Sequence, residues 1–313
     1  MAGPRQVVDG PGFTPLPYGL WDAAEHPAWD GPHWQNGITW QDRCPVTGGT
    51  VYDECIAVTG TGGAPAPQVS MSSNTVQTNR GATAFTVYAE FDCSPIGQDP
   101  TDKAQVALAR VESSLVEAAF WTGVSGAAAG PTPQTTVWPH LAANALLVDP
   151  QNITLQFAAS PLVTGGVDAA TALGSLEGAL ASCYGNNRGV VHVPRSVLPS
   201  LAAAKQLDYR TETDPRSGNA TGKALYTRAG NRLVVGGGYP GTSPSGTAPA
   251  AGTSWIYATG AVFAQRSEVN AFAMPGILDR AENTMRWTAQ RTYLVGYECC
   301  LYGALVKIGT PFA

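Results

Sequence analysis

The sequence predicts an α+β fold in which one long helix separates an alternating strand from a mixed region of short helices and strands. The helix is expected over residues 99–123, and the alternating strand over residues 85–93 directly before it. The mixed region occupies the rest of the chain. Because 313 residues are too many for one small module, we expect two sub-domains in one chain.

The long helix is marked at both ends by residues that favour helix termini. Asp99 is a natural N-cap, Pro100 suits the first helical position, and Gly123 suits the position after the last turn. Apolar residues at spacings of three and four form one stripe between these ends. The stripe consists of Ala104, Leu108, Val111, Leu115 and Ala119. This pattern predicts a continuous amphipathic helix.

Two strands joined by a long loop are expected before the helix. The first covers about residues 50–59, and the loop runs over residues 60–81. The second, residues 85–93, alternates apolar with polar positions. Its apolar side consists of Phe85, Val87, Ala89, Phe91 and Cys93. A lone two-stranded ribbon is marginal in water, so we expect another element or an adjacent subunit to cover one face.

The first 48 residues show no helical or strand periodicity but contain half of the eight tryptophans. These are Trp21, Trp29, Trp34 and Trp40. An irregular segment cannot form a core of its own, while each indole buries a large area when it finds a partner. Two interpretations remain open: the segment wraps its own domain, or it is an arm laid across a neighbouring subunit.

The mixed region is expected to contain two shorter helices, several strands and one polar loop. The helices cover residues 168–183 and 196–207, and the loop covers residues 208–222. The strands lie near residues 189–193, 232–235, 254–258 and 261–266, with a final long strand or strand pair over 284–308.

Composition favours a protein that associates with itself. Hydrophobic residues make up 44% of the chain and charged residues 13%, against about a quarter charged in ordinary soluble chains. A surface so poor in charge is expected to be hidden against copies of the chain. The 18 basic residues are scattered and the net charge is −5, so tight nucleic-acid binding is not expected. We expect neither a signal peptide nor a membrane span.

Motifs that would indicate chemistry are incomplete. Residues 236–241 match G-x-G-x-x-G after a strand, but the residues that follow cannot open the helix that a dinucleotide site needs, so a glycine loop is expected. Residues 241–246 miss the nucleophile-elbow spacing by one residue. His192 is interpreted as a hydrogen-bonded core histidine, and a hydrolase that uses it with a serine is the weakest alternative. Glu112 and Glu117 are expected on different helix faces, which excludes paired carboxylate chemistry.

The six cysteines are interpreted as buried thiols. Cys44 and Cys55 do not have the short spacing of a zinc knuckle, and a cross-link of Cys44 to Cys55 or Cys93 is a minor alternative. Cys299 and Cys300 are expected in a strand, where adjacent side chains point to opposite faces and cannot share a metal. We therefore expect no metal, no cofactor and no catalytic residue.

The order of these elements resembles the major capsid proteins of the Hong Kong 97 fold, which tailed bacteriophages and encapsulins share. Several stretches are similar to actinobacterial phage capsid proteins: residues 107–123, 189–195, 232–241, 255–262 and 297–306. The resemblance implies an α+β capsid fold with an extended N-arm, an E-loop hairpin, a spine helix, a peripheral domain and an axial domain. The implied divisions are 1–48 (N-arm), 49–98 (E-loop), 99–164 (peripheral domain with spine helix), 165–258 (axial domain) and 259–313 (return strands of the peripheral domain).

The resemblance also implies a function without chemistry. The chain would assemble with copies of itself, as hexamers and pentamers, into the icosahedral head around double-stranded DNA. It would be built in the host bacterial cytoplasm and reside in the virion. Alternatives are an encapsulin-type nanocompartment subunit and another virion structural protein, such as a tail or decoration protein.

The resemblance implies several partners and a set of contact residues. A separate scaffolding protein and a portal are expected, with packaged DNA contacted weakly and without sequence specificity. Shell stability would come either from burial of the arm and E-loop or from a cement protein. No lysine lies between residues 50 and 98, so the lysine cross-link known in the fold's type member is not expected; the nearest is Lys103. The expected inter-subunit contacts are Trp21, Trp29, Trp34, Trp40, Phe85, Tyr88 and Phe91.

Overall fold

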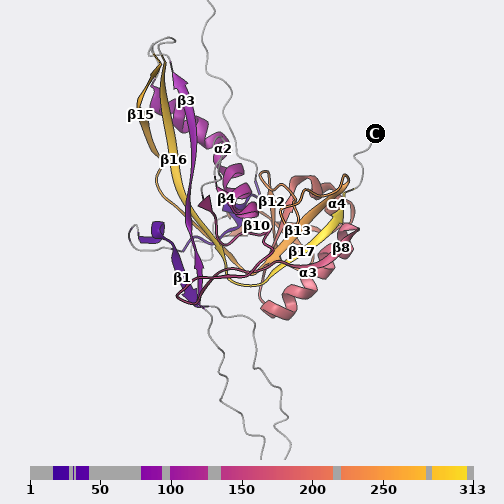
Figure 1. The fold of residues 1–313 in the computed structure, drawn as a ribbon. Coiled ribbons are helices and arrows are strands. Elements are labelled where there is room, and N and C mark those ends of the chain that lie inside the picture. The colour runs from indigo at the N-terminus through magenta and orange to yellow at the C-terminus, as the bar shows by residue number, and fades with distance from the viewer. Residues whose placement is uncertain are drawn as a thin grey trace, which may run out of the picture.

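A long ribbon of strands, with one helix beside it, extends from a rounded body built on a larger sheet (Figure 1). The computed structural model describes residues 17–27, 31, 33–41, 79–93, 99–125, 135–213, 220–279 and 284–308. The predicted strand at 50–59 and the side chains of Trp29, Cys44, Cys55 and Cys93 lie outside what is described.

The long helix α2 (Pro100–Thr122) forms as predicted. The Asp99 side chain accepts a hydrogen bond from the backbone N–H of Thr101 at 2.9 Å, and Gly123 ends the helix in the left-handed conformation at φ 75°. Its apolar stripe differs in one place, since Val111 is exposed and Glu112 is half-buried instead. The covered side chains of α2 recur every four residues, and Glu112 occupies one of these positions. Its carboxylate forms an ion pair with Arg291 of a neighbouring strand.

The ribbon is a sheet built around strand β16 (Thr284–Tyr297). On one side β16 pairs antiparallel with β3 (Ala84–Cys93); on the other it pairs with β14 (Val262–Arg266) and β15 (Asn270–Asp279). The predicted strands at 85–93 and 261–266 and the long C-terminal strand are confirmed, while β15 was not predicted. The described partner of β3 therefore comes from the C-terminal part of the chain, about two hundred residues away in sequence.

The body is built on a seven-stranded sheet, here called the central sheet. Its strand order is β10-β11-β12-β9-β13-β17-β8. The strands are β8 (Ser160–Val167), β9 (Val190–Pro194), β10 (Leu207–Thr213), β11 (Ala220–Thr227), β12 (Arg232–Gly236), β13 (Thr253–Thr259) and β17 (Leu301–Lys307). The predicted strands at 189–193, 232–235 and 254–258 are confirmed. Both β9–β12 and β8–β17 run parallel.

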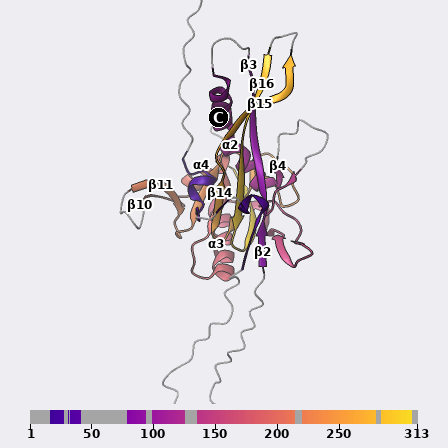
Figure 2. The same cartoon turned by 90° about the vertical axis from the view of Figure 1, so that its left-hand side faces the viewer.

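Helix α3 (Ala169–Tyr184) confirms the second predicted helix, with Asp168 as its N-cap. The third is shorter than predicted: a 3₁₀ turn, η2 (Arg195–Val197), leads into α4 (Leu198–Ala203). The predicted polar loop at 208–222 is wrong, because β10 and β11 form an antiparallel pair at the sheet edge. Residues 209–211 are all exposed, so this edge strand lacks the apolar alternation that would reveal it. The pair projects sideways from the body (Figure 2).

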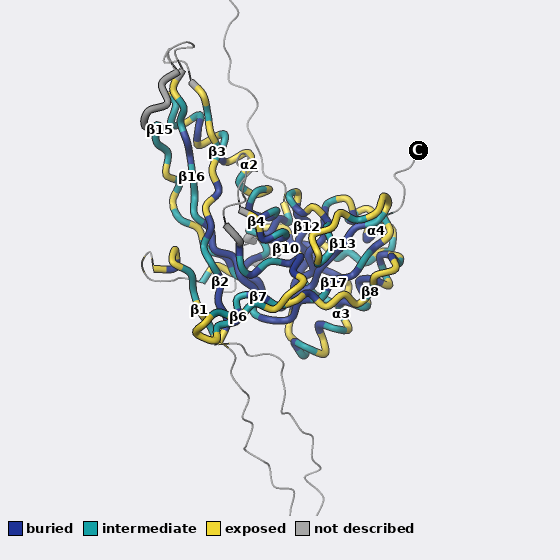
Figure 3. Tube along the Cα trace, viewed as in Figure 1, coloured by how far each residue is buried: buried dark blue, intermediate teal, exposed yellow. Residues whose placement is uncertain are grey.

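The central sheet separates two hydrophobic cores because successive side chains point to opposite faces. One core lies between the sheet and α2 with the ribbon, and the other lies between the sheet and α3 with α4. Members facing the first core include Val190, Val234, Trp255 and Tyr257. Members facing the second include Val191, Leu233, Ile256 and Ala258. The sheet interior is therefore buried on both sides, whereas the described residues toward the far end of the ribbon are of intermediate exposure or exposed (Figure 3).

Smaller elements complete the described chain. Helix α1 (Leu20–Ala23) and the 3₁₀ turn η1 (His33–Asn36) belong to the front of the chain. A four-stranded sheet has the order β1 (Ile38–Gln41), β2 (Asn79–Ala82), β7 (Ile153–Gln156) and β6 (Leu147–Val148). Strands β4 (Val124–Ser125) and β5 (Thr135–Thr136) pair with each other. Among the described residues, no helix combines the length and apolarity needed to span a bilayer.

Candidate functional site

The described part of the front segment, residues 17–41, packs against its own chain. The backbone N–H of Val235 donates to the carbonyl of Tyr18 at 2.8 Å, and that of Glu25 donates to the carbonyl of Val262 at 2.8 Å. Trp21 stacks on His26 with ring centroids 4.1 Å apart. These contacts favour the first interpretation of the segment, that it wraps its own domain.

Two residues expected to contact other subunits are instead buried within the chain. Trp34 is 7% exposed and packs with Ala82 and Leu294 at the base of the ribbon. Phe85 is 4% exposed and belongs to the first core beside Tyr293. The expectation that these two rings need a neighbour for burial is therefore wrong, because the base of the ribbon covers Trp34 and the first core surrounds Phe85.

Three more expected contact residues are partly covered by their own chain. Trp21 and Phe91 pack on the first core, and Trp40 meets the ring of Phe263 edge-on at 4.9 Å. Within the described residues, the indole N–H of Trp40 is buried without a hydrogen-bond acceptor. These side chains keep some exposed surface, so their role in contacts between subunits stays a prediction.

Tyr88 is the one described member of the expected set that is exposed, at 40%. It lies on the ribbon face opposite α2, which we call the outer ribbon face. Its residues are Thr86, Tyr88, Glu90 and Asp92 of β3 with Arg286, Thr288, Gln290 and Thr292 of β16, of which Thr288 is buried. Trp34 covers the base of this face through Leu294 and Ala84. The outer ribbon face is the candidate assembly surface.

Charge on the outer ribbon face is paired across the strands. Arg286 Nε lies 3.0 Å from Asp92 Oδ1, and its Nη1 lies 3.4 Å from Glu90 Oε2. These side chains are exposed, and the two carboxylates raise the pKa of Arg286. The face is therefore polar and available, which suits repeated contacts more than an internal core.

A buried carboxylate joins three separate segments where α2 meets the body. Glu117 Oε1 accepts from the backbone N–H of Leu20 at 3.1 Å, and Oε2 accepts from that of Gly238 at 2.9 Å. Burial raises the pKa of Glu117, while these hydrogen bonds and the charge of Arg195 act in the opposite direction. The sequence indicated only that Glu117 has no carboxylate partner and gave no sign of this junction.

The glycine-rich loop 236–241 packs directly on α2. A Cβ at Gly238 would lie 1.9 Å from the backbone oxygen of Ser114, so only glycine permits this approach. The indole N–H of Trp121 donates to Thr242 Oγ1 at 3.0 Å just beyond the loop. The prediction of a glycine loop is confirmed, and its glycines serve close packing against the helix.

His192 is a satisfied core histidine, as predicted. It is fully buried, its Nδ1 lies 3.1 Å from the Tyr239 hydroxyl, and its Nε2 lies 3.0 Å from Thr259 Oγ1. Burial lowers the pKa of His192 to about 3. A neutral ring held at both nitrogens inside a core is not placed to act on a substrate.

The cysteines differ from the prediction. Cys183 and Cys300 form a disulfide. Cys299 is also disulfide-bonded, and its Sγ lies 3.5 Å from Cys300 Sγ. The adjacent pair lies in the turn between β16 and β17, where Cys300 has φ 59°, so the strand rule of opposite faces does not apply. The available sequence signals were the adjacent pair Cys299 and Cys300 and the position of Cys183 at the end of a predicted helix. They were missed because Cys299 and Cys300 were expected in a strand.

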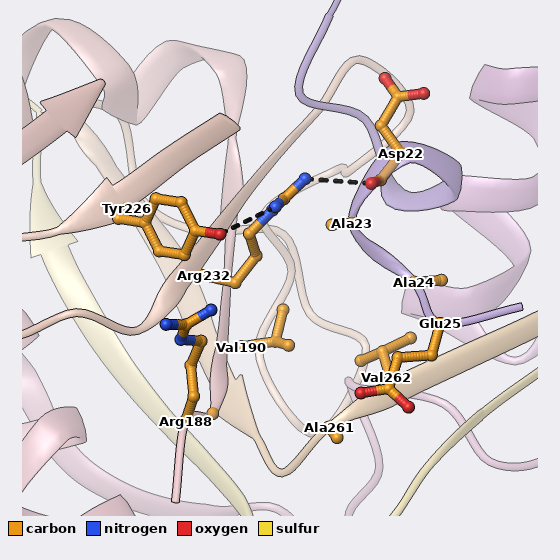
Figure 4. Close-up of a pocket in the computed structure, with 11 residues that line it drawn as sticks. Asp22, Ala23, Ala24, Glu25, Arg188, Val190, Tyr226, Arg232, Ala261 and Val262 are labelled. Atoms are coloured by element: carbon orange, nitrogen blue, oxygen red, sulfur yellow. Dashed lines mark hydrogen bonds between the residues drawn. The ribbon is translucent and has the colours of Figure 1, made fainter. Parts of the chain in front are cut away.

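A pocket of about 460 Å³ lies between the front segment and the central sheet (Figure 4). Arg232 donates to the Tyr226 hydroxyl at 3.1 Å and to the carbonyl of Asp22 at 3.0 Å. The Arg188 guanidinium lies 5.1 Å from the centre of the Tyr226 ring. Burial lowers the pKa of Arg232. These contacts tie the front segment to the sheet, which gives the pocket a structural role.

Comparison with known proteins bears on the fold. No family model and no curated protein matches the chain. Solved structures that are similar include the capsid of an empty GTA particle, with 11% identity, 98% of this chain and 95% of that chain covered, and a TM-score of 0.50. The native GTA capsid has 10% identity, coverages of 98% and 95%, and a TM-score of 0.48. The structure from Microbacterium phage Oxtober96 has 14% identity, covers 97% of this chain and 95% of that chain, and has a TM-score of 0.46. The first of these likenesses spans nearly all of both chains, and with the long helix, ribbon and central sheet described above it shows that this chain has the Hong Kong 97-type capsid fold.

Proposed function

We propose that the chain is the major capsid protein of a tailed bacteriophage, which assembles with copies of itself into the icosahedral head around double-stranded DNA. The observation that carries the proposal is the fold likeness to a capsid chain over 98% of this chain and 95% of that one. A likeness of this extent leaves no large additional domain in the described chain that would indicate another task.

The shape of the subunit supports assembly through many modest contacts. The ribbon extends beyond the body, and its outer face is not covered by any element packed along it beyond the base, within the described residues. Each contact would bury apolar surface worth about 25 cal/mol per Å². Tyr88 supplies the large exposed ring on this face. Summed over many copies, small contacts of this kind hold a closed shell.

The finer assignments belong to the same proposal. Residues 1–48 would act as the N-arm, 49–98 as the E-loop, 99–164 and 259–313 as the peripheral domain, and 165–258 as the axial domain at the centres of hexamers and pentamers. The chain would act without catalysis, with scaffolding, portal and cement proteins as separate partners. Contact with packaged DNA would be weak. Assembly would take place in the host cytoplasm, and the final location would be the virion.

Negative-stain microscopy and light scattering of the purified chain test the proposal. We expect closed shells or capsomers for the parent chain, and a marked loss of both for Tyr88→Asp, which adds a third carboxylate beside Glu90 and Asp92. The matched control is Tyr88→Phe, which keeps the ring and should assemble normally. A parent chain that remains monomeric at high concentration, with or without added scaffold, would contradict the proposal.

The encapsulin alternative predicts a different set of neighbours and contents. An adjacent gene for a cargo enzyme with a docking tail, and shells filled with that enzyme, would support it. Adjacent portal and terminase genes, and shells that package DNA, would support the phage head.

A further inference from the structure

Two arginine side chains line the pocket between the front segment and the central sheet (Figure 4). Arg188 lies just before β9 and Arg232 begins β12, and these strands are parallel neighbours. The backbone N–H of Arg232 donates to the carbonyl of Gly189 at 2.9 Å, and Asn231 Oδ1 accepts from the N–H of Gly189 at 2.9 Å. The backbone that carries both arginines is therefore fixed beside the pocket.

The two guanidinium groups differ in their contacts. Arg232 is 9% exposed, and its guanidinium donates to the Tyr226 hydroxyl and to the carbonyl of Asp22. Arg188 is exposed, and its guanidinium lies over the Tyr226 ring. Among the described residues, no carboxylate forms an ion pair with Arg188. Arg232 is thus a fixed charge in the pocket wall, and Arg188 is an exposed charge whose N–H donors can reach a ligand.

Positive charge gathers on one side of the pocket. The two guanidinium groups lie on the side of the Tyr226 ring, and the carboxylates of Asp22 and Glu25 point away from them (Figure 4). Burial lowers the pKa of Arg232, the charge of Asp22 raises it, and the charge of Arg188 lowers it. The last effect shows that the two arginine charges repel each other. An anion in contact with both would relieve this repulsion.

The size and charge of the pocket favour a small dianion as the ligand. Its volume of about 460 Å³ is typical of sites for small molecules. A phosphate monoester carries about two negative charges and three strong acceptor oxygens, so it can pair with two guanidinium groups at once. A carboxylate carries one charge and matches one guanidinium. Asp22 and Glu25, which also line the pocket, would repel the many charges of a nucleic-acid backbone.

We propose that this pocket binds a phosphate dianion between Arg188 and Arg232, either inorganic phosphate or the terminal phosphate of a nucleotide. Arg188 supplies a planar fork of N–H donors, and Arg232 supplies a fixed positive charge. Because Arg232 also holds the carbonyl of Asp22, a bound phosphate stabilises the attachment of the front segment to the central sheet. The inference concerns the single chain and does not depend on its assembly.

Isothermal titration calorimetry of the full chain with inorganic phosphate tests the site, with sodium chloride keeping the ionic strength constant. We expect saturable binding of one phosphate per chain. Arg188→Gln should weaken binding by about tenfold or more, because a charge-assisted hydrogen bond is lost. Arg210→Gln is the matched control and should bind like the parent. Arg210 also lies over the Tyr226 ring, at 4.9 Å, but it pairs with Asp208 and does not line the pocket.

Thermal unfolding gives a second measurement on the same chains. Phosphate should raise the melting temperature of the parent and of Arg210→Gln above the value in chloride, and should not change that of Arg188→Gln. Circular dichroism checks that each variant is folded. Arg188→Lys keeps the charge but lacks the planar fork, so its affinity should lie between those of the parent and Arg188→Gln. This variant decides the matter if Arg188→Gln folds poorly.

Two further titrations separate the sources of the phosphate. A nucleoside monophosphate that displaces inorganic phosphate and binds more tightly would identify a nucleotide as the ligand, and equal affinities would identify the free ion. Both results support the site.

Four results would overturn the proposal. The first is the absence of saturable phosphate binding to the parent chain, and the second is equal affinity in Arg188→Gln. The third is a rise in melting temperature with acetate as large as that with phosphate, which would indicate a carboxylate site. The fourth is an oligonucleotide without terminal phosphates that binds through Arg188 and is not displaced by phosphate, which would assign the pocket to nucleic acid.

Discussion

The central sheet and the ribbon are both made of long strands, but they are covered differently. Interior strands of the central sheet are buried on both faces, and their sequences are nearly continuous apolar runs, as in β9 and β12. Strands β3 and β16 are covered by α2 on one face, and apolar and polar residues alternate along them. The interior strands of the central sheet are therefore covered on both faces within the chain, whereas the ribbon leaves exposed residues on one face, which we propose for contacts between subunits.

The largest loss of stability is expected when Trp121 is replaced. Its ring is fully buried and contacts Tyr239 and Tyr257. Trp121→Ala would leave a cavity between α2 and the central sheet and should lower the free energy of unfolding by about 3–5 kcal/mol, measured by urea denaturation. The control Tyr88→Ala on the outer ribbon face should change it by less than about 0.5 kcal/mol. Equal losses would mean that the outer face is as essential to folding as the junction.

A smaller effect is expected where the glycine loop touches α2. Gly238→Ala places a methyl group against the backbone of Ser114 and should cost about 1–3 kcal/mol through forced movement of the loop. Gly237→Ala is the matched control, since its Cβ would meet only Arg195 Nε at 3.4 Å. Thermal unfolding of both variants measures the difference. Closely similar melting temperatures would show that the loop gives way and that the close approach is not required.

The pH dependence of stability tests the burial of the central-sheet face that packs on the first core, where His192 meets the ring of Phe120. The folded pKa of His192 is about 3, against about 6.5 in the unfolded chain. The unfolded state therefore binds a proton first as pH falls. The contribution of His192 is complete above about pH 6.5 and is lost towards pH 3, by about 1.4 kcal/mol per pH unit.

The measurement compares unfolding free energies of the parent and His192→Gln from pH 7 to pH 4. The variant should lack this part of the slope. Thr259→Val is the control, because it removes the Nε2 partner but keeps the titrating ring, so its slope should equal that of the parent. A parent slope that persists in His192→Gln would assign the effect to other groups.

The smallest effects sharpen the contrast between the two faces of the ribbon. On the covered face, Glu112 accepts from Arg291 at 3.1 Å and from the Tyr293 hydroxyl at 3.1 Å in a half-buried site. Glu112→Gln should cost about 1–2 kcal/mol, because it removes a charge from a hydrogen-bonded pair. Asp92→Asn on the outer face removes one of two exposed carboxylates beside Arg286 and should leave the urea midpoint unchanged. A larger loss of stability for Asp92→Asn than for Glu112→Gln would mean that the outer ribbon face, and not the face toward α2, is the covered one.

Local signals in the sequence were sufficient to predict the elements whose causes are local. Helix α2 begins and ends as predicted because Asp99 and Gly123 satisfy its terminal groups without help from distant residues. Strand β3 was predicted from alternation, and His192 from its place within an apolar run. The fold class followed from the order of these elements, and the structure and its comparison confirm it.

Features that depend on distant partners could not be predicted in the same way. Nothing near Phe85 indicates that it packs on Tyr293, more than two hundred residues later in the chain. Trp34 was assigned to a neighbour because its cover, Leu294, lies still further away in the sequence. The β10–β11 pair was missed because residues 209–211 of the edge strand β10 are all exposed, so buried and exposed positions do not alternate there. Glu117 was overlooked because its partners are backbone N–H groups, which any sequence supplies.

The central sheet contributes side chains to both hydrophobic cores, and this limits how the subunit can be divided or deformed. The same strands contribute alternate side chains to both cores. An excised body would therefore expose Val234 and Tyr257 to water, and an excised ribbon would lose the sheet residues against which its core packs. Neither half is an independent folding unit, so unfolding should occur as one cooperative event. In the proposed shell, a change of curvature between subunits would then be taken up by bending along α2 and β16, where the ribbon extends beyond the central sheet.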